Sequence, residues 1–376
     1  MMKKLNVIAF ELMEKKTILL VYKGHFSYLP PFQSLVEALL STNKYKLKVI
    51  CSEEEPDMDE LYKNENLEFI HYYTLEPRKG FASRVRNHIK TVTLFKKRVK
   101  SDLDSIKYDV LWIIYERTAI SMRDILVGRK YILTSYELRD YSEPELMKPL
   151  ARPMKEAKVN IQCEYNRAWI ARMIYGLNET PLVIPNKPFY HPSDRNDSTD
   201  KIVSDGKKII LYQGVLTRER NLDGMCKAIS SLDDFKLVIL GKETEYAKEL
   251  KRKYNLVEFP GFIKSPAHLK LTSNAYIGLV TYNPLDLDCA YCAPNKIWEF
   301  SGFGIPMICN EIPGLEYTVK AHKCGVCTDT DDPTSIVDAI KTIADNYEEY
   351  SINAKKMYDN VNLIELINHV LDKYYS

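Results

Sequence analysis

Short apolar runs alternate with helical patterns along the chain, and this alternation limits the fold more than any other feature of the sequence. In the first half the runs are 17–22, 47–51, 67–72, 110–114, 131–135 and 159–163. A second series contains 209–213, 236–240, 257–259, 275–281, 307–310 and 325–328. Strands that are apolar on both faces and separated by helices are typical of parallel sheets covered on both sides. The pattern predicts the α/β class, with two doubly wound, Rossmann-like domains that face a central cleft and bind ligands at the carboxyl ends of their strands.

The stretch 186–208 separates the two series. It contains prolines, serines and charged residues and almost no apolar ones, which indicates an interdomain linker with an adjoining loop. After Asp332-Pro333, an N-cap followed by a proline in the first helical turn, the pattern stays helical. The expected parts are an N-terminal domain at 1–190, a linker at 191–206, a C-terminal domain at 207–355 and a helix at 356–376 that can cross back to the N-terminal domain.

The charge balance excludes one broad class of function. The chain has 53 lysines and arginines against 51 aspartates and glutamates, a net charge of +2, so binding of nucleic acid through overall charge is not expected. The N-terminal lysines precede only a short apolar run before Glu11 and Glu14, without a signal-peptide cleavage site. No apolar stretch approaches the ~20 residues of a membrane-spanning helix. We expect a cytoplasmic protein, with peripheral attachment to the cytoplasmic membrane face left open.

Two groups of residues have the form of metal ligands, but neither has convincing spacing. Cys289 and Cys292 form one Cys-x-x-Cys pair, and Cys324 and Cys327 form another. The stretch between the pairs is longer than the ~15–20 residues of a zinc ribbon, and it contains a helix, a turn and a strand. The Asp-x-Asp sequence at 286–288 precedes a late helix instead of ending an early strand. We expect free thiols, no metal site and no cofactor.

The most informative segment for function begins at Pro294. A proline fits the first turn of a helix, and the free amides of that turn form an anion site with the helix dipole. Asn295 and Lys296 stand four and three positions before Glu299, so these polar groups share one helix face. A lysine near phosphate and a carboxylate that accepts bonds from both ribose hydroxyls suit a nucleotide diphosphate. A solvated amphipathic helix with an incidental ion pair explains the pattern equally well.

Two other segments complete a candidate donor site. A buried strand ends at Gly214, and the loop after it carries Arg218 and Arg220. Glycine allows close approach of the backbone to phosphate, and arginine gives forked recognition of phosphate oxygens. The alternative is a surface loop with two exposed arginines. A strand–turn–apolar segment further on offers Phe262 and Ile263 as a shelf for a base ring.

In this order and spacing, the three segments resemble the C-terminal half of retaining GT-B glycosyltransferases of family 4, the glycosyl transferases group 1. That family typically has a Gly loop ending in a basic residue, a strand–Gly turn, and a Pro-Asn-Lys-x-x-Glu helix followed by Gly-x-Pro. The matching residues are Gly214, Arg220, Gly261, Phe262, Pro294, Asn295, Lys296, Glu299, Gly304 and Pro306. The resemblance covers roughly 207–345, and in the N-terminal half it rests on architecture and on Lys23-Gly24.

Two positions of the C-terminal half depart from the family pattern. The family's paired glutamates are spaced E-x7-E; Glu299 matches the second, whereas Tyr291 stands at the first. Val215 stands where an arginine often directly follows the glycine, which leaves Arg218 as a substitute. The first departure puts recognition of the sugar hydroxyls in question.

The N-terminal half departs as well. Many relatives place a histidine after an N-domain strand, where this chain has Ser135-Tyr136-Glu137. Glu137 and His25, which follows Gly24, are therefore the acceptor-side candidates, and Gly24 is a donor-side candidate. His25 is otherwise a structural or exposed residue.

The resemblance implies transfer of a hexose from a nucleotide-sugar to a glycan or lipid-linked acceptor, with retention, in surface polysaccharide or glycoconjugate synthesis. UDP-sugars are favoured and GDP-sugars are possible. Arg220, Arg218 and Lys296 would stabilise the leaving diphosphate without a metal. Two alternatives stay open: a GT-B sugar-nucleotide epimerase, and a non-catalytic nucleotide-binding or scaffold partner of another transferase.

The segment 78–100 carries nine cationic residues and no acidic one. Apolar residues recur along it at steps of three and four, which predicts an amphipathic helix with a basic polar face. Such a helix either packs its apolar stripe on the sheet and leaves its charges in water, or docks on anionic lipid. The sequence leaves both interpretations open.

Overall fold

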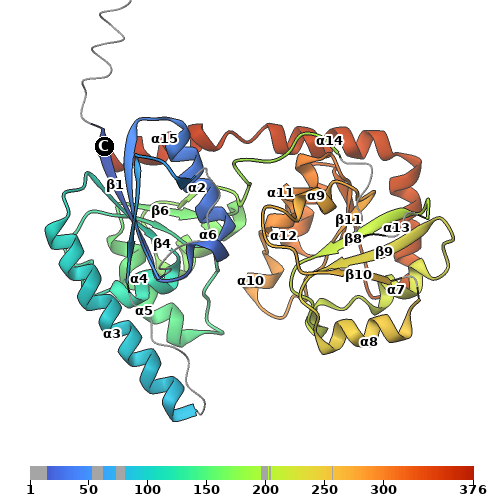
Figure 1. The fold of residues 1–376 in the computed structure, drawn as a ribbon, viewed down its shortest axis with the longest axis horizontal. Helices are drawn as coiled ribbons and strands as arrows, with labels where there is room; N and C mark the ends of the chain where they lie inside the picture. The colour runs from blue at the N-terminus through green and yellow to red at the C-terminus, as the bar shows by residue number, and fades with distance from the viewer. Residues whose placement is uncertain (1–14, 53–61, 73–80, 196–201, 203–204, 256) are drawn as a thin grey trace, which may run out of the picture. The chain divides into compact units, whose positions relative to one another are not determined.

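The computed structural model describes residues 15–52, 62–72, 81–195, 202, 205–255 and 257–376. The chain divides into two compact units. The first comprises the described residues up to Ile184 together with Leu363–Ser376, and the second is Pro185–Asn362. Each unit contains one parallel sheet with helices on both faces (Figure 1).

The first unit has a seven-stranded sheet in the order β3-β2-β1-β4-β5-β6-β7. Its strands are β1 (Lys16–Tyr22), β2 (Tyr45–Cys51), β3 (Leu67–His71), β4 (Val110–Ile114), β5 (Ile132–Thr134), β6 (Val159–Gln162) and β7 (Leu182–Val183). Every strand pair is parallel. All of β4 is buried, as expected for a strand covered on both faces. The sequence did not predict β7, because two residues are too few to form an apolar pattern.

The helices of the first unit include one from the far end of the chain. They are η1 (Phe26–Tyr28), α2 (Pro30–Ser41), α3 (Phe81–Ser105), α4 (Glu116–Met122), α5 (Pro144–Glu156), α6 (Tyr165–Tyr175) and α15 (Leu363–Tyr375). Helix α15 packs against α2 and β6, and the Tyr374 hydroxyl donates to the Lys130 carbonyl at 3.2 Å. The C-terminal helix therefore completes the first unit.

The second unit has a six-stranded parallel sheet in the order β10-β9-β8-β11-β12-β13. Its strands are β8 (Lys208–Gln213), β9 (Phe235–Leu240), β10 (Val257–Gly261), β11 (Ile277–Val280), β12 (Met307–Asn310) and β13 (Gly325–Thr328). Its helices are η3 (Arg218–Arg220), α7 (Asp223–Ile229), α8 (Glu245–Lys253), α9 (Leu269–Thr272), α10 (Leu287–Ala290), α11 (Asn295–Gly302), α12 (Pro313–Leu315), η4 (Glu316–Lys320), α13 (Pro333–Asp345) and α14 (Tyr347–Asp359). This strand order is the doubly wound order that the alternating pattern predicted.

Strand β8 shows how this sheet is buried on both faces. Ile210 and Tyr212 belong to one apolar cluster, together with side chains of α7 and α13. Leu211, between them, belongs to a second cluster with side chains of α9 and α11. Successive strand residues point to opposite faces, so a run that is apolar at every position needs a cover on each side. The prediction of two-sided burial is confirmed.

The end of the chain is helical, as predicted, but in three pieces: α13, α14 and α15. Asp332 caps α13, because its carboxylate accepts from the Thr334 and Ser335 backbone N–H groups at 3.3 and 2.9 Å. Within the described residues no helix is both long enough and apolar enough to cross a membrane.

The described part of the expected linker is tied to the second unit. The Lys187 ammonium donates to the carbonyls of Tyr358 and Val361, at 2.7 and 2.6 Å. His191 packs its ring against Phe303, with 4.3 Å between the ring centroids. Residues 196–201 and 203–204 of the expected linker lie outside the described part of the chain.

Candidate functional site

The carboxyl ends of β8 and β11 meet at the point where the strand order of the second sheet reverses. Ligands of doubly wound sheets bind at such a switch point. Gly214 follows β8 with φ +125°, a conformation that favours glycine. A Cβ atom on Gly214 would lie 3.4 Å from Lys296 Nζ, and one on Gly241 would lie 2.3 Å from the Gly214 carbonyl oxygen. The two glycines keep the backbone of this loop close-packed and bare beside the lysine.

Lys296 stands in the first turn of α11 and is partly buried. Its ammonium lies 4.2 Å from the Tyr212 ring centroid and 5.7 Å from that of Tyr282. Burial lowers the pKa of Lys296 to about 7, and the positive charge of Arg220 lowers it further, against the opposing effect of Glu299. An anion bound next to this ammonium would restore its charge.

Helix α11 begins one residue later than predicted. Pro294 is the N-cap, with extended dihedrals (φ −73°, ψ 141°), and Asn295 is the first helical residue. The prediction that Pro294 lies in the first turn was wrong by one position, because its ψ angle is not helical. Asn295 and Lys296 therefore occupy the start of the helix, where N–H groups lack partners within the helix.

Arg220 lies next to the same tyrosine as Lys296. Its guanidinium carbon is 3.5 Å from the Tyr282 ring centroid, and Nη1 donates to the Thr281 carbonyl at 3.1 Å. Among the described residues, Arg220 makes no other hydrogen bond or ion pair, so most of its N–H donors are open to a ligand. The switch point thus carries two cations, and no carboxylate that the structure describes is bound to Arg220.

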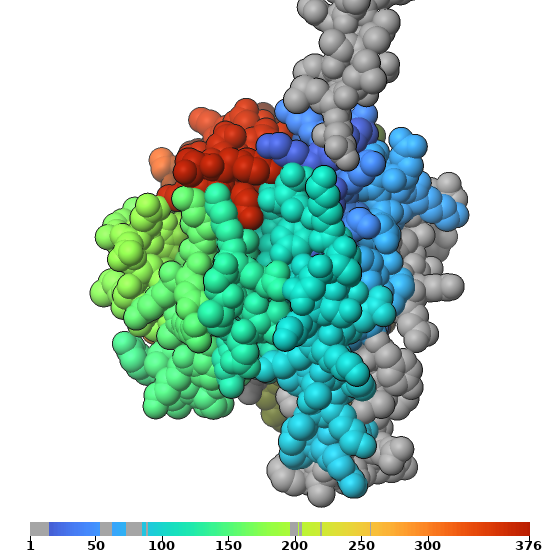
Figure 2. Space-filling view, turned by 90° about the vertical axis from the view of Figure 1, so that its left-hand side faces the viewer, coloured from blue at the N-terminus to red at the C-terminus, as the bar shows by residue number. Residues whose placement is uncertain are grey.

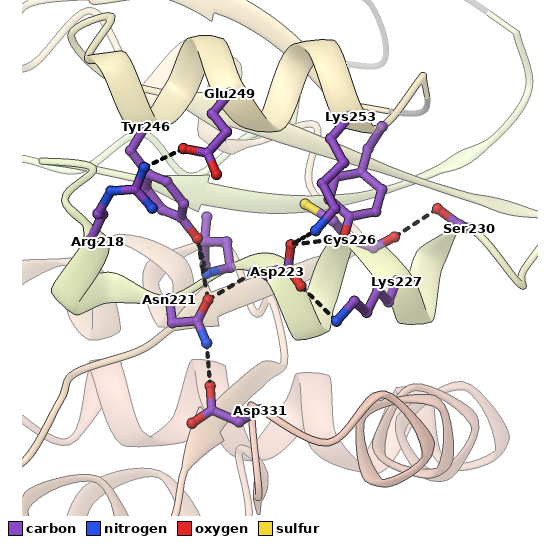
Figure 3. Close-up of polar contacts among 12 residues, drawn as sticks. Arg218, Asn221, Asp223, Cys226, Lys227, Ser230, Tyr246, Glu249, Lys253 and Asp331 are labelled. Carbon is purple, nitrogen blue, oxygen red and sulfur yellow. Dashed lines mark hydrogen bonds and ion pairs between the residues drawn. The ribbon is translucent and has the colours of Figure 1, made fainter.

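Arg218 has a different environment, although only one residue separates it from Arg220. It is largely exposed and forms an ion pair with Glu249 of α8. Its guanidinium carbon lies 5.4 Å from the Tyr246 ring centroid. Figure 3 shows Arg218 pointing toward α8, in a surface network that continues through Asn221 to Asp331. The turn of η3 sends the two arginines to different partners.

Glu299 is held by side chains from two other elements. His268 Nε2 lies 3.2 Å from Glu299 Oε1, and the Gln213 side-chain amide donates to Oε2. Thr272 in turn donates to Gln213 Oε1 at 2.8 Å. Burial alone would raise the pKa of Glu299, but the hydrogen bonds from His268 and Gln213 and the charge of Lys296 outweigh it and lower the pKa. The carboxylate is therefore ionised and fixed in direction.

Sequence reasoning did not identify His268, Gln213 or Tyr282 as site residues. His268 stands just before α9, and no motif surrounds it. Gln213 is the last residue of β8 and Tyr282 follows β11, so the rule that ligands bind at carboxyl ends of strands was the available signal. No sequence motif links His268 to Glu299, so their contact could not be predicted from the sequence.

Phe262 and Ile263, the predicted base shelf, follow β10 and differ in exposure. Phe262 is 58% exposed, with Lys242 Nζ 5.4 Å from its ring centroid. Ile263 is partly buried and packs against the second apolar cluster of this unit. Of these two residues, only Phe262 is exposed, and its aromatic ring could serve as a stacking surface for a base.

The acceptor-side candidates lie in the first unit. His25 is exposed and precedes η1, and its ring centroid lies 5.5 Å from that of Tyr28. Gly24 is packed closely, because a Cβ atom there would lie 2.4 Å from the Tyr22 ring. Glu137 follows β5, and its backbone N–H points to Glu116 Oε2 at 3.5 Å.

The carboxyl ends of β1 and β4 form the switch point of the first unit. The Lys23 backbone N–H donates to Thr118 Oγ1 at 2.9 Å, and Lys23 Nζ donates to Ser121 Oγ at 3.1 Å. Tyr115 adopts φ +77°, which is strained for a bulky residue. Next to it, the fully buried Glu116 accepts from Arg139 Nη2 at 2.9 Å. At this switch point the chain itself pairs the buried carboxylate of Glu116 with an arginine.

The cysteine pairs do not come together as a metal centre. Cys327 of β13 lies opposite Cys309 of β12 in the sheet register, and Cys289 belongs to α10. Cys324 points its thiol at Met357, with 3.7 Å between the sulfur atoms. Over the described ranges, no three His, Cys, Asp or Glu side chains are arranged to hold a metal ion.

Comparison with known families assigns the second unit. Residues 194–360 match the sequence profile of the family "Glycosyl transferases group 1". This range contains Gly214, Arg220, Lys296 and Glu299, the residues on which the resemblance rested. The second unit therefore carries a group 1 glycosyltransferase domain, as the motifs predicted. A search of curated protein sequences finds no match.

Solved structures agree along nearly the full length of the chain. A sucrose-phosphate synthase from Thermosynechococcus elongatus aligns with a TM-score of 0.70 at 14% identity, over 96% of this chain and 98% of that one. The Anabaena protein HepE in complex with UDP and glucose aligns with a TM-score of 0.69 at 13% identity, over 96% and 99%. A putative UDP-N-acetylglucosamine 2-epimerase from Listeria monocytogenes aligns with a TM-score of 0.62 at 10% identity, over 97% of each chain. These similarities confirm the predicted GT-B fold.

Proposed function

We propose that this glycosyltransferase takes a hexose from a nucleotide-sugar, with UDP-sugars favoured and GDP-sugars possible, and transfers it with retention to a glycan or lipid-linked acceptor. The observation that carries the proposal is the pair of cations at the switch point of the second unit. Arg220 and Lys296 both lie against Tyr282, beside the bare backbone of Gly214. Two like charges this close repel each other, and a diphosphate would relieve the repulsion.

The roles of the residues follow from the charge that develops during transfer. Departure of the nucleotide diphosphate increases negative charge on its oxygens, which Arg220, Lys296 and the first turn of α11 would stabilise. Glu299, fixed by His268 and Gln213, would accept hydrogen bonds from the ribose hydroxyls. Phe262 would stack on the base. HepE was crystallised in complex with UDP and glucose, which supports a UDP-linked donor for a chain of the same fold.

A screen with nucleotide-sugars would test the proposal and its two rivals together. The purified protein would be incubated with UDP- and GDP-sugars, with and without a lipid and glycan extract as acceptor, and the anomeric configuration of the product determined by NMR. Acceptor-dependent transfer with retention supports the proposal. Isomerised donor without acceptor would instead establish an epimerase, the activity named for the Listeria neighbour. Donor binding without turnover would establish a non-catalytic partner, in line with Tyr291 at the first glutamate position.

We also propose that the transfer needs no metal or other cofactor, because two protein cations are available for the diphosphate. Activity should survive EDTA at full rate. Loss of activity in EDTA, regained with Mg²⁺ or Mn²⁺, would contradict this. Zinc at stoichiometric level in purified protein would require a site among the cysteines.

The acceptor would bind in the first unit, for which His25 and Glu137 are the candidates. Surface polysaccharide or glycoconjugate synthesis on the cytoplasmic side of a membrane is the setting that such an acceptor suggests. Replacing His25 or Glu137 by alanine should raise the KM for acceptor and leave donor binding unchanged. Equal effects on both substrates would remove these two residues from an acceptor role.

A further inference from the structure

Helix α3 is packed along only part of its length. Phe95, Val99 and Leu103 on its C-terminal half are buried, with at most 4% of each residue exposed. The same stripe continues to Val85 and Ile89, which are 44% and 60% exposed. Figure 1 shows the N-terminal end of α3 reaching beyond the strands of the first unit, and Figure 2 shows this part of the helix, in cyan, protruding from the unit. Packing within the first unit therefore accounts for the apolar stripe in only the C-terminal half of the helix.

The cations of α3 divide in a similar way. Lys96 pairs with Asp124 at 2.8 Å, and Arg98 pairs with Asp102 at 2.9 Å. Arg86, Lys90 and Lys97 are exposed, and none of them forms a hydrogen bond or ion pair with any residue that the structure describes. Lys96 and Arg98 are thus neutralised by the protein, whereas Arg86, Lys90 and Lys97 are left for a partner.

Helical geometry puts these three cations on one strip. Arg86, Lys90 and Lys97 stand at positions i, i+4 and i+11, which share one side of an α-helix. The strip lies next to Val85 and Ile89, because one residue corresponds to about 100° of rotation. We call these five residues the α3 end surface. It combines exposed apolar side chains with unpaired positive charge, and the surrounding segment 78–100 contains no acidic residue.

We propose that the α3 end surface docks on an anionic phospholipid membrane. Val85 and Ile89 would enter the headgroup region, and Arg86, Lys90 and Lys97 would lie at the lipid phosphates, as amphipathic helices do at an interface. Charge complementarity selects a lipid surface of negative charge over a neutral one. The proposal does not depend on the donor chemistry, because the residues that would bind the donor belong to the second unit.

Co-sedimentation of the full chain with vesicles tests the proposal. Vesicles of phosphatidylglycerol mixed with phosphatidylcholine should bind the protein at low salt, and raised salt should release it, since screening shortens the Debye length to ~3 Å at 1 M. Vesicles of phosphatidylcholine alone should bind it far less. Equal binding to both kinds of vesicle, or no binding to anionic vesicles at low salt, would overturn the proposal.

Charge-removal variants locate the docking surface. Each cation near an anionic membrane strengthens binding about fivefold, so the combined change Arg86→Gln, Lys90→Gln and Lys97→Gln should weaken it about 100-fold. The matched control removes three exposed lysines of the second unit, Lys251, Lys341 and Lys356, by the same substitution and should bind as wild type. If both variants lost vesicle binding equally, the net charge of the protein would explain the binding. That result would overturn the assignment of the docking surface to α3.

A second variant tests the apolar part of the surface. Val85→Ser with Ile89→Ser should weaken vesicle binding by at least about tenfold, because apolar burial contributes to interfacial binding. The melting temperature should stay unchanged, since both side chains are already exposed. Both variants should bind UDP as wild type does. If the serine variant bound vesicles as well as wild type, the contact would be electrostatic only. That result would contradict insertion of Val85 and Ile89 into the headgroup region.

Discussion

Each unit of this glycosyltransferase has a central strand at which the sheet order reverses, β1 beside β4 in the first and β8 beside β11 in the second. In the second unit the chain leaves this point through Gly214 at φ +125°, and Arg220 and Lys296 face one tyrosine. In the first unit the turn after β4, the counterpart of β11, carries a strained tyrosine, followed by a buried glutamate that an arginine neutralises.

The difference shows how one architecture can place either paired or unpaired charges at its switch point. Arg139 donates to Glu116 and Glu143 within the first unit, so these charges are compensated by the fold. Arg220 and Lys296 raise each other's electrostatic energy, which the lowered pKa of Lys296 reflects. In our proposal, the diphosphate binds where the chain leaves the cations Arg220 and Lys296 without carboxylate partners. Substitutions at each point should therefore affect different properties.

The largest expected effect is on stability, in the first unit. Replacing Arg139 by Met leaves Glu116 buried without its partner, which should lower the free energy of unfolding by about 3–5 kcal/mol. Hydrogen exchange of the β4 amides would report the loss in this unit, alongside denaturant unfolding. Lys355→Met, which removes a cation from an exposed pair with Asp359, is the control and should cost less than about 1 kcal/mol. Similar small effects for both variants would show that Glu116 does not need its partner.

The next effect is on rate, in the second unit. Arg220→Ala should lower kcat by ~10²–10³-fold, because the charge on the diphosphate grows toward the transition state. Arg218→Ala should change kcat little, since Arg218 pairs with Glu249. Steady-state kinetics at saturating donor compares the two. Equal losses would bring Arg218 into the site, and a wild-type rate for Arg220→Ala would remove Arg220 from it.

Glu299 should affect affinity more than stability. Glu299→Gln keeps the size of the side chain but removes the charge that would bind the ribose hydroxyls, and should weaken binding of UDP by about 1.5–3 kcal/mol in a calorimetric titration. Glu316→Gln removes a carboxylate from an exposed pair with Lys320 and should leave binding unchanged. An unaltered Kd for the Glu299 variant would place the ribose elsewhere.

The smallest expected effect is a change in the number of protons that the protein takes up when it binds UDP. Lys296 has a pKa of about 7 when free, and a bound diphosphate would raise it. Calorimetry in buffers of different ionisation enthalpy should therefore show proton uptake with UDP at about pH 8, where the free lysine is mostly neutral, and little at about pH 6, where it is already charged. Lys296→Arg should bind without this uptake, because arginine stays protonated throughout. Identical proton counts at both pH values would argue against a diphosphate next to Lys296.

Much of the fold follows from local sequence. Every apolar run that was predicted as a strand overlaps one, and Asp332 caps a helix as its motif indicated. The reason is that a strand buried on both faces must be apolar at every position. Such a run of consecutive apolar residues can be recognised in the sequence alone. The two-residue strand β7 was not predicted, because it is defined by its pairing with β6 and not by an apolar pattern of its own.

The candidate site was predicted in part for the same reason. Gly214, Lys296 and Glu299 belong to local motifs, in which backbone conformation and helix position dictate the residue type. The separate partners of Arg218 and Arg220 depend on the turn of η3, which directs Arg218 to Glu249 of α8 and Arg220 to Tyr282. His268 reaches Glu299 from the residue before α9, so no spacing within one sequence motif predicts the contact.

By itself, the sequence determined the α/β class, the two sheets, the group 1 family and the motif residues of the second unit. Tertiary structure alone decided which charges stay uncompensated: Arg139 is matched by two carboxylates, whereas Arg220 meets a tyrosine ring and a lysine. It also decided that α3 is buried at one end and exposed at the other. Charge and apolarity are properties of residues, but compensation and exposure depend on neighbours that only the folded chain brings together.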